Sequence, residues 1–338
     1  MPNNIRKAVI SSFGDESKVS VVDSIIEDPP ANHVQVRVLY SGFSGADINM
    51  RLGVYPLQRK APLTPGYTFI GRVRANGAGS TKYSPGDLVT CLTICDAEAE
   101  LANVPEKYLI QPPAGVDLQQ ACALILDWNT AYGLVMHSAK VSAGQKVFIH
   151  GISGAVGYAT MILSQLQGAE VYGTASAAKH AHVKQLGATP FDYSNKDWMA
   201  SMKDLGGTDA VFDALGFESW DESFSILSKH GILVGYGGNL NRLKGEPTRS
   251  GVGPTAKLLA RNLNVFCGKR TKFYYITRDD RTFNQDVMTL FDLSLQGKIR
   301  VPIKRIYNLE DIQEAHKSWN STGGVGSILI KVADEDST

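Results

Sequence analysis

The sequence lacks a long apolar run, a dense set of cysteines and an excess of charge of either sign. The longest uninterrupted apolar stretch, residues 121–126, is far shorter than the roughly 18–20 residues that a membrane span requires. The first residues contain no apolar core of a secretory signal, and the 338 residues include only four cysteines. We therefore expect a reduced, cytoplasmic protein with no membrane partner.

The charge of the chain is balanced, with 34 Lys and Arg against 33 Asp and Glu, a formal net charge of +1. This balance gives no reason to expect a nucleic-acid partner. Hydrophobic residues make up 43% of the chain and charged residues 20%, as in ordinary globular proteins, which excludes wholesale disorder. At about 100–200 residues per domain, the length predicts two domains.

The residue pattern changes near position 125. Before it, short apolar segments alternate with turns rich in Pro and Gly, and residues 34–39 (VQVRVL) alternate with a period of two. This pattern predicts a mostly β domain with further strands at 69–73 and 87–92. One helical turn is expected around residues 46–52.

From residue 145 the pattern becomes strand, glycine turn and helix, repeated, which predicts βαβ units and a parallel sheet. Residues 235–254 carry six glycines and are expected to be loop-rich. The final stretch, 283–332, reads as helix, strand, helix and strand, and is expected to return to the first domain. The expected strands are 146–150, 170–174, 209–212 and 232–234, and the expected helices are 154–167 and 179–186.

The strongest chemical signal is the sequence HGISGAVG at residues 150–157, between an expected strand and an expected helix. Gly151, Gly154 and Gly157 allow a tight turn and a close approach to a pyrophosphate, which the following helix N-terminus also attracts. Ile152 stands where the common G-x-G-x-x-G fingerprint has its first glycine. A glycine turn made for packing alone is the alternative, and the βαβ context favours a dinucleotide.

The choice of dinucleotide depends on the end of the second βαβ strand, about 20 residues further on, where an acid would bind the ribose of NAD. Residues 174–179 (TASAAK) contain no Asp or Glu. Ser176 can donate a hydrogen bond and Lys179 a positive charge to a 2′-phosphate. We therefore expect NADPH rather than NADH.

Seven segments in the same order resemble a known family, the medium-chain dehydrogenase/reductase superfamily, in its zinc-free, quinone oxidoreductase-like (zeta-crystallin-like) branch. The resemblance implies a GroES-like, mostly β domain over residues 1–125, completed by 267–338, and a Rossmann doubly wound parallel sheet over 126–266. It also implies a homodimer. The segments are residues 41–56, 62–73, 84–89, 130–135, 150–157, 173–193 and 209–216.

Zinc-dependent members of that superfamily carry a Cys where this chain has Ser44, and Gly-His-Glu where it has Gly66–Tyr67–Thr68. The third ligand position falls near the apolar Leu126, and only Cys91 and Cys95 lie in reach of the structural zinc lobe. Zinc requires Cys, His or carboxylate ligands. We therefore expect no metal.

Without a metal, oxidation of a neutral alcohol is disfavoured, because zinc normally makes the alkoxide accessible. An enone, enal, enoyl thioester or quinone is already electrophilic and suits hydride transfer better. Tyr55 matches a tyrosine that the resemblance implies as proton donor, and packing at the rim of a cleft is its alternative. Ser44 can hydrogen-bond a substrate carbonyl, and Asp47 is expected to be a helix N-cap.

The resemblance also implies a set of cofactor contacts and a substrate pocket. The pocket residues are expected to be Tyr67, Asp127, Trp128 and Tyr275, although a surface salt bridge is the favoured alternative for Asp127, and core packing is the alternative for the aromatic residues at 273–275. The expected cofactor contacts are Thr130, Gly151, Ser153, Gly154, Ala155, Val156, Gly157, Ser176, Lys179, Tyr193, Leu215, Gly235, Tyr236, Phe273 and Tyr274.

The chain departs from the family pattern at two places. Residues 96–101 read DAEAEL where the family has Gly-Gly-Tyr-Ala-Glu-Tyr, and Gly326–Ser327 replaces Gly-Lys. The leading interpretation is an NADPH-dependent reductase of activated C=C bonds or quinones. A non-redox, NADPH-binding protein and a tailoring reductase with a large substrate remain as alternatives.

Overall fold

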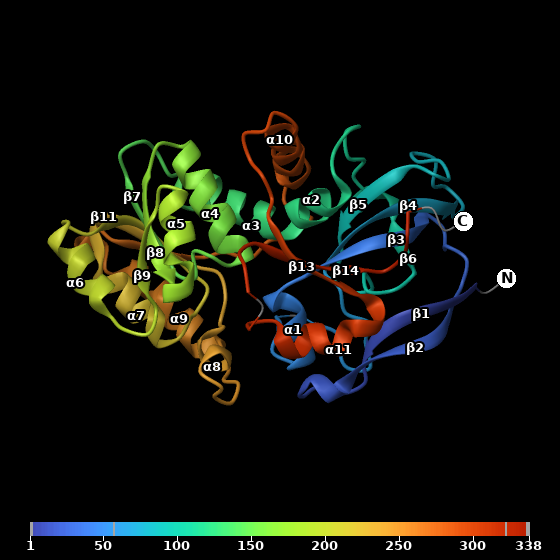
Figure 1. Ribbon diagram of the computed structural model, residues 1–338, viewed down its shortest axis with the longest axis horizontal. Coiled ribbons are helices and arrows are strands. Elements are labelled where there is room, and N and C mark those ends of the chain that lie inside the picture. The colour runs from blue at the N-terminus through green and yellow to red at the C-terminus, as the bar shows by residue number, and fades with distance from the viewer. Residues whose placement is uncertain (1–2, 57, 322, 336–338) are drawn as a thin grey trace. The chain divides into compact units, whose positions relative to one another are not determined.

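The computed structural model describes residues 3–56, 58–321 and 323–335 (Figure 1). The chain forms two compact units, which are described separately. The first comprises the described residues up to Asn129, then Thr277–Gly323 and those from Ser327 onward; the second comprises Thr130–Ile276 and Gly324–Gly326. The division expected from the resemblance, after residues 125 and 266, stays a prediction.

The first unit is built on β strands, as its sequence pattern predicts. Strands β1 (Asn3–Ile10) and β2 (Val19–Ile26) form an antiparallel hairpin. A six-stranded sheet has the order β13-β14-β3-β4-β5, with β6 also paired to β3. Its strands are β3 (His33–Phe43), β4 (Thr68–Asn76), β5 (Leu88–Leu92), β6 (Leu101–Pro105), β13 (Ile303–Asn308) and β14 (Ser327–Lys331).

The last part of the chain completes this first sheet, which confirms the expectation for residues 283–332. Strand β14 pairs antiparallel with β3, with Leu329 opposite Gly42. Its inward side chains are fully buried, which adds apolar contact area to a sheet begun by the first hundred residues. The helices of this unit are α1 (Gly45–Arg51), α2 (Leu118–Ala123), α10 (Phe283–Leu295) and α11 (Ile312–Ser318).

The second unit is a parallel sheet in the order β12-β11-β10-β7-β8-β9. The order reverses between β7 and β10, which is the switch point where open α/β sheets bind ligands. This is the predicted doubly wound sheet, with α4 and α5 on one side of the strands and α7 and α9 on the other (Figure 1). The strands are β7 (Lys146–Ile149), β8 (Glu170–Ala175), β9 (Thr189–Asp192), β10 (Thr208–Asp213), β11 (Leu227–Gly235) and β12 (Arg270–Phe273).

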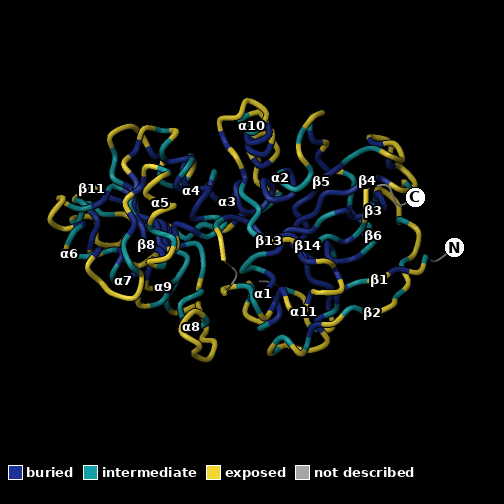
Figure 2. The backbone as a smooth tube through the Cα atoms, viewed as in Figure 1, coloured by how far each residue is buried: buried dark blue, intermediate teal, exposed yellow. Residues whose placement is uncertain are grey.

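The helices of the second unit cover a sheet whose two inner strands, β7 and β10, are almost wholly buried (Figure 2). The core is aromatic: Phe148 and Trp198 pack with their ring centroids 5.0 Å apart. The helices are α3 (Asn129–Tyr132), α4 (Ala155–Leu166), α5 (His180–Gln185), α6 (Asp197–Asp204), α7 (Glu218–Ser225), α8 (Leu240–Leu243) and α9 (Val252–Ala260).

The structure differs from the sequence-based expectation in several regions. Strand β11 begins at Leu227 instead of residue 232: Leu227 pairs with Thr208 of β10, and the register then shifts, so that residues 228–231 form an irregularity before Ile232 pairs with Ala210. Helix α8 and the start of α9 lie inside the stretch 235–254, which was expected to be loop-rich. The β1–β2 hairpin was not recognised, because its second strand is largely exposed and lacks clean alternation.

Candidate functional site

The glycine loop joins β7 to α4 at the switch point of the second unit. Gly151 has φ +71°, a conformation that favours glycine. Gly154 is the N-cap of α4, and its N–H donates to the carbonyl oxygen of Gly151 at 2.9 Å. A Cβ on Gly157 would lie 2.2 Å from that same carbonyl oxygen. The loop therefore needs glycine at position 151, for its positive φ, and at position 157, for want of room, and it leaves the first turn of α4 open to an anion.

The loop after β10 lies beside the glycine loop because β10 pairs with β7. Asp213, the last residue of β10, is fully buried. Its Oδ1 atom accepts hydrogen bonds from the N–H groups of Leu215 (2.7 Å) and Gly216 (3.3 Å). Gly216 has φ +77°. The carboxylate of Asp213 thus fixes the turn that carries Leu215, one of the expected cofactor contacts.

The end of β8 is free of acidic residues, as the sequence indicates. Ser176 follows the strand, and burial lowers the pKa of the partly buried Lys179. The ring of Tyr193 is exposed, and its N–H donates to the carbonyl oxygen of Ala175 at 3.3 Å. Asp192 lies opposite Ala175 on β9, but its carboxylate accepts the N–H of Ser194 at 2.8 Å.

Ser153 in the glycine loop and Thr130 on α3 are buried, whereas Ala155 and Val156 at the start of α4 are partly exposed. These four residues stay predicted cofactor contacts.

The ends of β11 and β12 bring together further expected contacts. The N–H of Tyr274 donates to the carbonyl oxygen of Gly235 at 2.8 Å, and that of Tyr236 donates to the main-chain carbonyl oxygen of Asp213 at 3.1 Å. Burial, together with the charge of Asp213, raises the pKa of the Tyr236 phenol. A Cβ on Gly133 would lie 2.0 Å from the hydroxyl of Tyr274, so the glycine of the TAYGLV segment accommodates this ring.

Two aromatic residues beyond β11 have different surroundings. Phe273 packs edge-on against Trp220, with ring centroids 6.1 Å apart. A Cβ on Gly235 would lie 2.7 Å from the same indole. Tyr275 is 38% exposed. Phe273 therefore has the core packing that was left open as an alternative, while Tyr275 keeps a face to solvent.

In the first unit, Tyr55 and Tyr67 lie together. Their ring centroids are 5.2 Å apart at an interplanar angle of 60°. Tyr67 is buried, whereas Tyr55 is partly exposed and its N–H donates to Oε1 of Gln58 at 2.9 Å. The edge-to-face contact orients the Tyr55 ring without burying it.

Ser44 and Asp47 form the start of α1, and one expectation is corrected here. Ser44 is the N-cap, because its Oγ accepts the N–H of Ala46 at 3.1 Å. Asp47 is the third helical residue, and its carboxylate accepts the N–H groups of Ser44 (2.8 Å) and Gly66 (3.2 Å). The expectation that Asp47 is the N-cap was wrong, since the two residues form a capping box. Burial raises the pKa of Asp47 to about 7.

Two further buried acids belong to the first unit. Asp127 accepts the hydroxyl of Ser327 at 2.6 Å, and burial raises its pKa to about 6. The alternative of a surface salt bridge for Asp127 is therefore wrong. The neighbouring Trp128 is fully buried. Glu98, in the segment that departs from the family pattern, is fully buried, and neither of its carboxyl oxygens has a hydrogen-bond partner in the described part of the chain.

The charge of Asp47 acts on the titration of Glu98. Burial, and then the charge of Asp47, raise the pKa of Glu98 well above its usual range. Sequence reasoning noted that an aromatic residue is lost from segment 96–101 but did not single out Glu98. No local signal singles out Glu98, because the acids at positions 96, 98 and 100 alternate in the same way with apolar residues.

No three His, Cys, Asp or Glu side chains within residues 3–56, 58–321 and 323–335 are placed to hold a metal ion. In the same ranges, no helix is long and apolar enough to cross a membrane. The absence of a metal stays a prediction.

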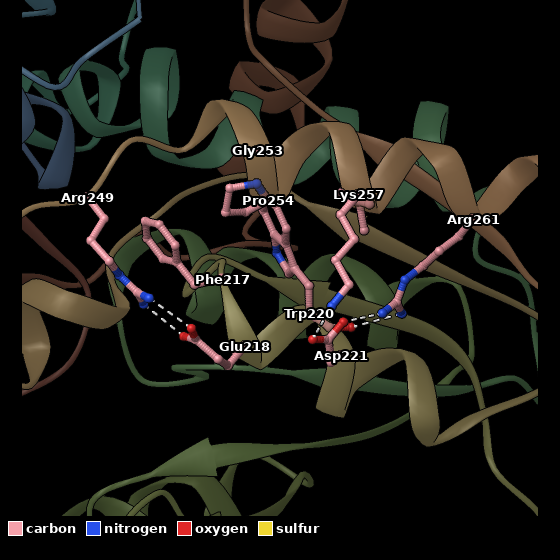
Figure 3. Close-up of a pocket in the computed structure, with 10 residues that line it drawn as sticks. Phe217, Glu218, Trp220, Asp221, Arg249, Gly253, Pro254, Lys257 and Arg261 are labelled. Atoms are coloured by element: carbon pink, nitrogen blue, oxygen red, sulfur yellow. Dashed lines mark hydrogen bonds and ion pairs between the residues drawn. The ribbon is translucent and has the colours of Figure 1, made fainter.

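A surface cavity of about 230 Å³ lies between α7 and α9 (Figure 3). Its charged side chains pair with one another: Arg249 binds Glu218 through two hydrogen bonds of 2.9 and 2.8 Å, and Lys257 and Arg261 both bind Asp221. None of the residues expected in the functional site lines this cavity.

Known proteins resemble both units. Residues 30–113 match the family model of the alcohol dehydrogenase GroES-like domain, and residues 186–330 match that of the zinc-binding dehydrogenase. A synaptic vesicle membrane protein VAT-1 homolog of Danio rerio is 28% identical over 341 residues, covering 96% of this chain and 69% of that protein. A probable quinone oxidoreductase of Schizosaccharomyces pombe is 27% identical over 333 residues, covering 97% of each.

Among solved structures, that of the mycobacterial protein Rv1454c complexed with NADPH has a TM-score of 0.85 at 25% identity. The match covers 97% of this chain and 100% of that chain.

Proposed function

The chain belongs to the medium-chain dehydrogenase/reductase superfamily, in its quinone oxidoreductase-like branch, and on that premise we propose that it is an NADPH-dependent reductase of activated C=C bonds or quinones. The single observation that carries the proposal is the glycine loop at the sheet's switch point, followed by a β8 end that has Ser176 and Lys179 but no acid. The enone, enal, enoyl or quinone substrate and the absence of zinc are parts of the proposal.

The residues of the second unit fit a dinucleotide. Gly157 has no room for a Cβ beside Gly151, so the backbone of the loop is held open for close approach of a pyrophosphate. Lys179 and Ser176 would hold the 2′-phosphate, with the exposed Tyr193 beside them. Tyr236 and Tyr274, at the ends of β11 and β12, would flank the nicotinamide. When bound, NADPH supplies the hydride.

The first unit would supply the groups that act on the substrate. Negative charge develops on the carbonyl oxygen of an enone or quinone as it is reduced, and preorganised donors stabilise that charge. The phenol of Tyr55 is the proposed donor of the proton, held by its contact with Tyr67. Ser44 is the proposed second hydrogen-bond donor. Asp127 and Trp128 are proposed to line the substrate pocket, and the assignment of Tyr275 to that pocket stays a prediction.

Binding of NADPH and NADH, measured by isothermal titration calorimetry, tests the cofactor assignment. We expect NADPH to bind at least about tenfold more tightly than NADH, which corresponds to about 1.4 kcal/mol. Equal affinities would contradict the assignment of Ser176 and Lys179.

We also propose a homodimer, formed through β12. In the described part of the chain β12 pairs with β11 and with no other strand. Three apolar side chains just before it are highly exposed: Leu263 (84%), Val265 (75%) and Phe266 (97%). Such a patch on an open sheet edge needs a cover. Sedimentation analysis should give a dimer for the native protein and a monomer for Phe266→Ser combined with Val265→Ser. The expected cytoplasmic location stays a prediction.

A further inference from the structure

We propose that His150 is a positioning residue that couples the two loops of the nucleotide site through its two ring nitrogens. On one side it contacts Thr174, which holds the glycine loop; on the other it contacts Ser223, which holds Asp213 and the loop after β10. The inference rests on the proposed function, because it assigns these contacts a role in cofactor binding.

The first half of the connection joins β8 to the glycine loop. Oγ1 of Thr174 accepts the N–H of Gly151 at 3.1 Å and lies 3.4 Å from Nδ1 of His150. The carbonyl oxygen of Thr174 also accepts the N–H of Ile152 at 3.0 Å. Thr174 therefore holds two successive amides of the turn that carries the glycines.

The second half joins His150 to the loop after β10. Nε2 of His150 lies 3.0 Å from Oγ of Ser223 on α7, and that hydroxyl donates to Oδ2 of Asp213 at 2.7 Å. Ser219 donates to the same oxygen at 2.7 Å. The other oxygen, Oδ1, holds the amides of the turn at Leu215 and Gly216. The carboxylate of Asp213 therefore accepts four hydrogen bonds, two at each oxygen.

The donors and acceptors of this chain can be assigned one by one. Asp213 accepts four hydrogen bonds, so the single hydroxyl proton of Ser223 goes to it, and the oxygen of Ser223 must accept from His150. Nε2 of His150 therefore carries the proton and Nδ1 is an acceptor. In the neutral ring Nδ1 has no proton, so the hydroxyl of Thr174 donates to it while the same oxygen accepts from Gly151. The geometry thus requires a proton on Nε2, and it suits the neutral Nε2–H tautomer.

The surroundings of His150 favour this neutral form. The residue is 4% exposed, and its ring lies edge-on to Phe148 (5.2 Å) and Trp198 (5.0 Å). Burial lowers its pKa, and the charges that act against this effect are those of Asp213, with Oδ2 3.8 Å from Nε2, and of Glu222. An imidazolium carries a proton on Nδ1, so Thr174 could no longer donate to it, and protonation would reverse the hydrogen bond on the side of the glycine loop.

The hydrogen-bond network through His150 should affect the affinity for NADPH. The amides of Gly151, Leu215 and Gly216 belong to two loops at the switch point. The amide of Gly151 is bonded to one end of the buried hydrogen-bond network, and those of Leu215 and Gly216 are bonded to its other end. A change at one end removes an orienting contact from its own loop and alters the proton arrangement at the other. We therefore expect substitutions at Thr174 and Ser223 to be coupled in their effect on NADPH affinity, although neither side chain is expected to touch the cofactor.

The tautomer is measured first, on the native protein without cofactor, from long-range ¹H–¹⁵N correlations of its histidine side chains. The signal of His150 is the one that disappears in the variant His150→Gln. In the native protein this signal should show a protonated Nε2 and an unprotonated Nδ1, and this state should persist well below the pH at which exposed histidines titrate. A protonated Nδ1, or an ordinary titration of this ring, would overturn the proposal. This readout does not depend on enzyme activity.

The second measurement is the NADPH dissociation constant of Thr174→Val, Ser223→Ala and the double variant. Each single variant should weaken binding about five- to tenfold, and the double variant should weaken it by clearly less than the product of the two. Thr174→Ser, which keeps the hydroxyl, should restore the native value. Thr208→Val removes another buried hydroxyl, at the amino end of β10, and should change the dissociation constant less than twofold.

The outcomes separate this inference from the proposed function. If the native protein binds NADPH but Thr174→Val and Ser223→Ala bind it as the Thr208→Val control does, the positioning role is wrong and the reductase assignment stands. Effects that multiply fully in the double variant would contradict the coupling through His150. Failure of the native protein to bind NADPH would contradict the proposed function, and with it the positioning role of His150.

Discussion

The hydroxyl of Ser327 donates a 2.6 Å hydrogen bond to Oδ2 of Asp127, and so joins two buried residues that are 200 positions apart in the sequence. Ser327 stands where the family pattern has a lysine, and its hydroxyl gives the buried acid a neutral partner. Burial raises the pKa of Asp127 by more than this hydrogen bond and the charge of Lys304 lower it, so the pKa rises from 3.8 to about 6.

Asp127→Asn should stabilise the protein at high pH. Because the pKa of Asp127 is raised by about two units in the folded state, its ionised form costs about 3 kcal/mol above about pH 6, and the cost disappears as the pH falls toward 4. Asparagine keeps an acceptor for Ser327 and carries no charge. Thermal unfolding should show a higher midpoint for the variant at about pH 8 and equal midpoints near pH 4. If the variant lost the same amount of stability at both pH values, the pKa of Asp127 would not be raised in the folded protein.

Glu98→Met should also stabilise the protein at neutral and high pH. Glu98 is buried without a hydrogen-bond partner in the described residues, and its pKa is raised well above the usual range by burial and by Asp47. The folded state must therefore bind a proton that the unfolded state releases above about pH 4.3, so stability falls as the pH rises.

Methionine fills the same space without this proton uptake, and a gain of about 1–3 kcal/mol in the free energy of unfolding is expected at about pH 8. Glu314→Met makes the same substitution at an exposed position of α11 and should leave the unfolding curve unchanged. If both variants shift the curve equally, the gain would come from hydrophobicity alone.

Gly157→Ala should weaken NADPH binding about tenfold or more, because its Cβ would lie 2.2 Å from the carbonyl oxygen of Gly151 and the loop backbone would have to move. Gly154→Ala provides a matched control: its Cβ would lie 3.3 Å from the same oxygen, and φ at Gly154 is −77°. The control should bind NADPH within about threefold of the native protein. Equal losses in titration calorimetry would argue that the close approach does not matter.

Lys179→Ala should weaken NADPH binding about five- to twentyfold and leave NADH binding unchanged, because only NADPH carries the 2′-phosphate. The native preference should also decline with ionic strength, and that of the variant should not. Lys184→Ala removes an exposed lysine from α5 and serves as the control. A parallel loss of affinity for both cofactors would place Lys179 elsewhere in the site.

Much of the fold follows from local pattern. The period-two alternation of residues 34–39 marks β3, and the strand–glycine–helix repeat from residue 145 marks β7, α4 and β8. In each of these segments the local sequence preference agrees with the observed secondary structure. Whether the segment is a strand or a helix can therefore be inferred without knowing what packs against it. Segment 227–235 is different: Leu227 pairs with Thr208 of β10 ahead of a register shift, and this early start of β11 before residues 228–231 has no signal in the local pattern.

The buried polar groups could not be predicted in the same way. His150 was recognised as the first residue of the glycine motif, but its partner Ser223 lies 73 positions further on, and no periodicity links the two. Asp47 and Glu98 each look like an ordinary polar residue of a turn or strand. Their burial depends on how separate strands come together, which the sequence of each segment does not encode.

Turnover with NADPH tests the account most directly. Native protein and Tyr55→Phe are compared by the loss of NADPH absorbance with a panel of small enones, enals and quinones, with NADH in parallel. We predict turnover by the native protein with a preference for NADPH, and a loss of about tenfold or more in kcat for Tyr55→Phe with little change in the NADPH dissociation constant. Tight NADPH binding with no turnover of any of these substrates would contradict the reductase assignment.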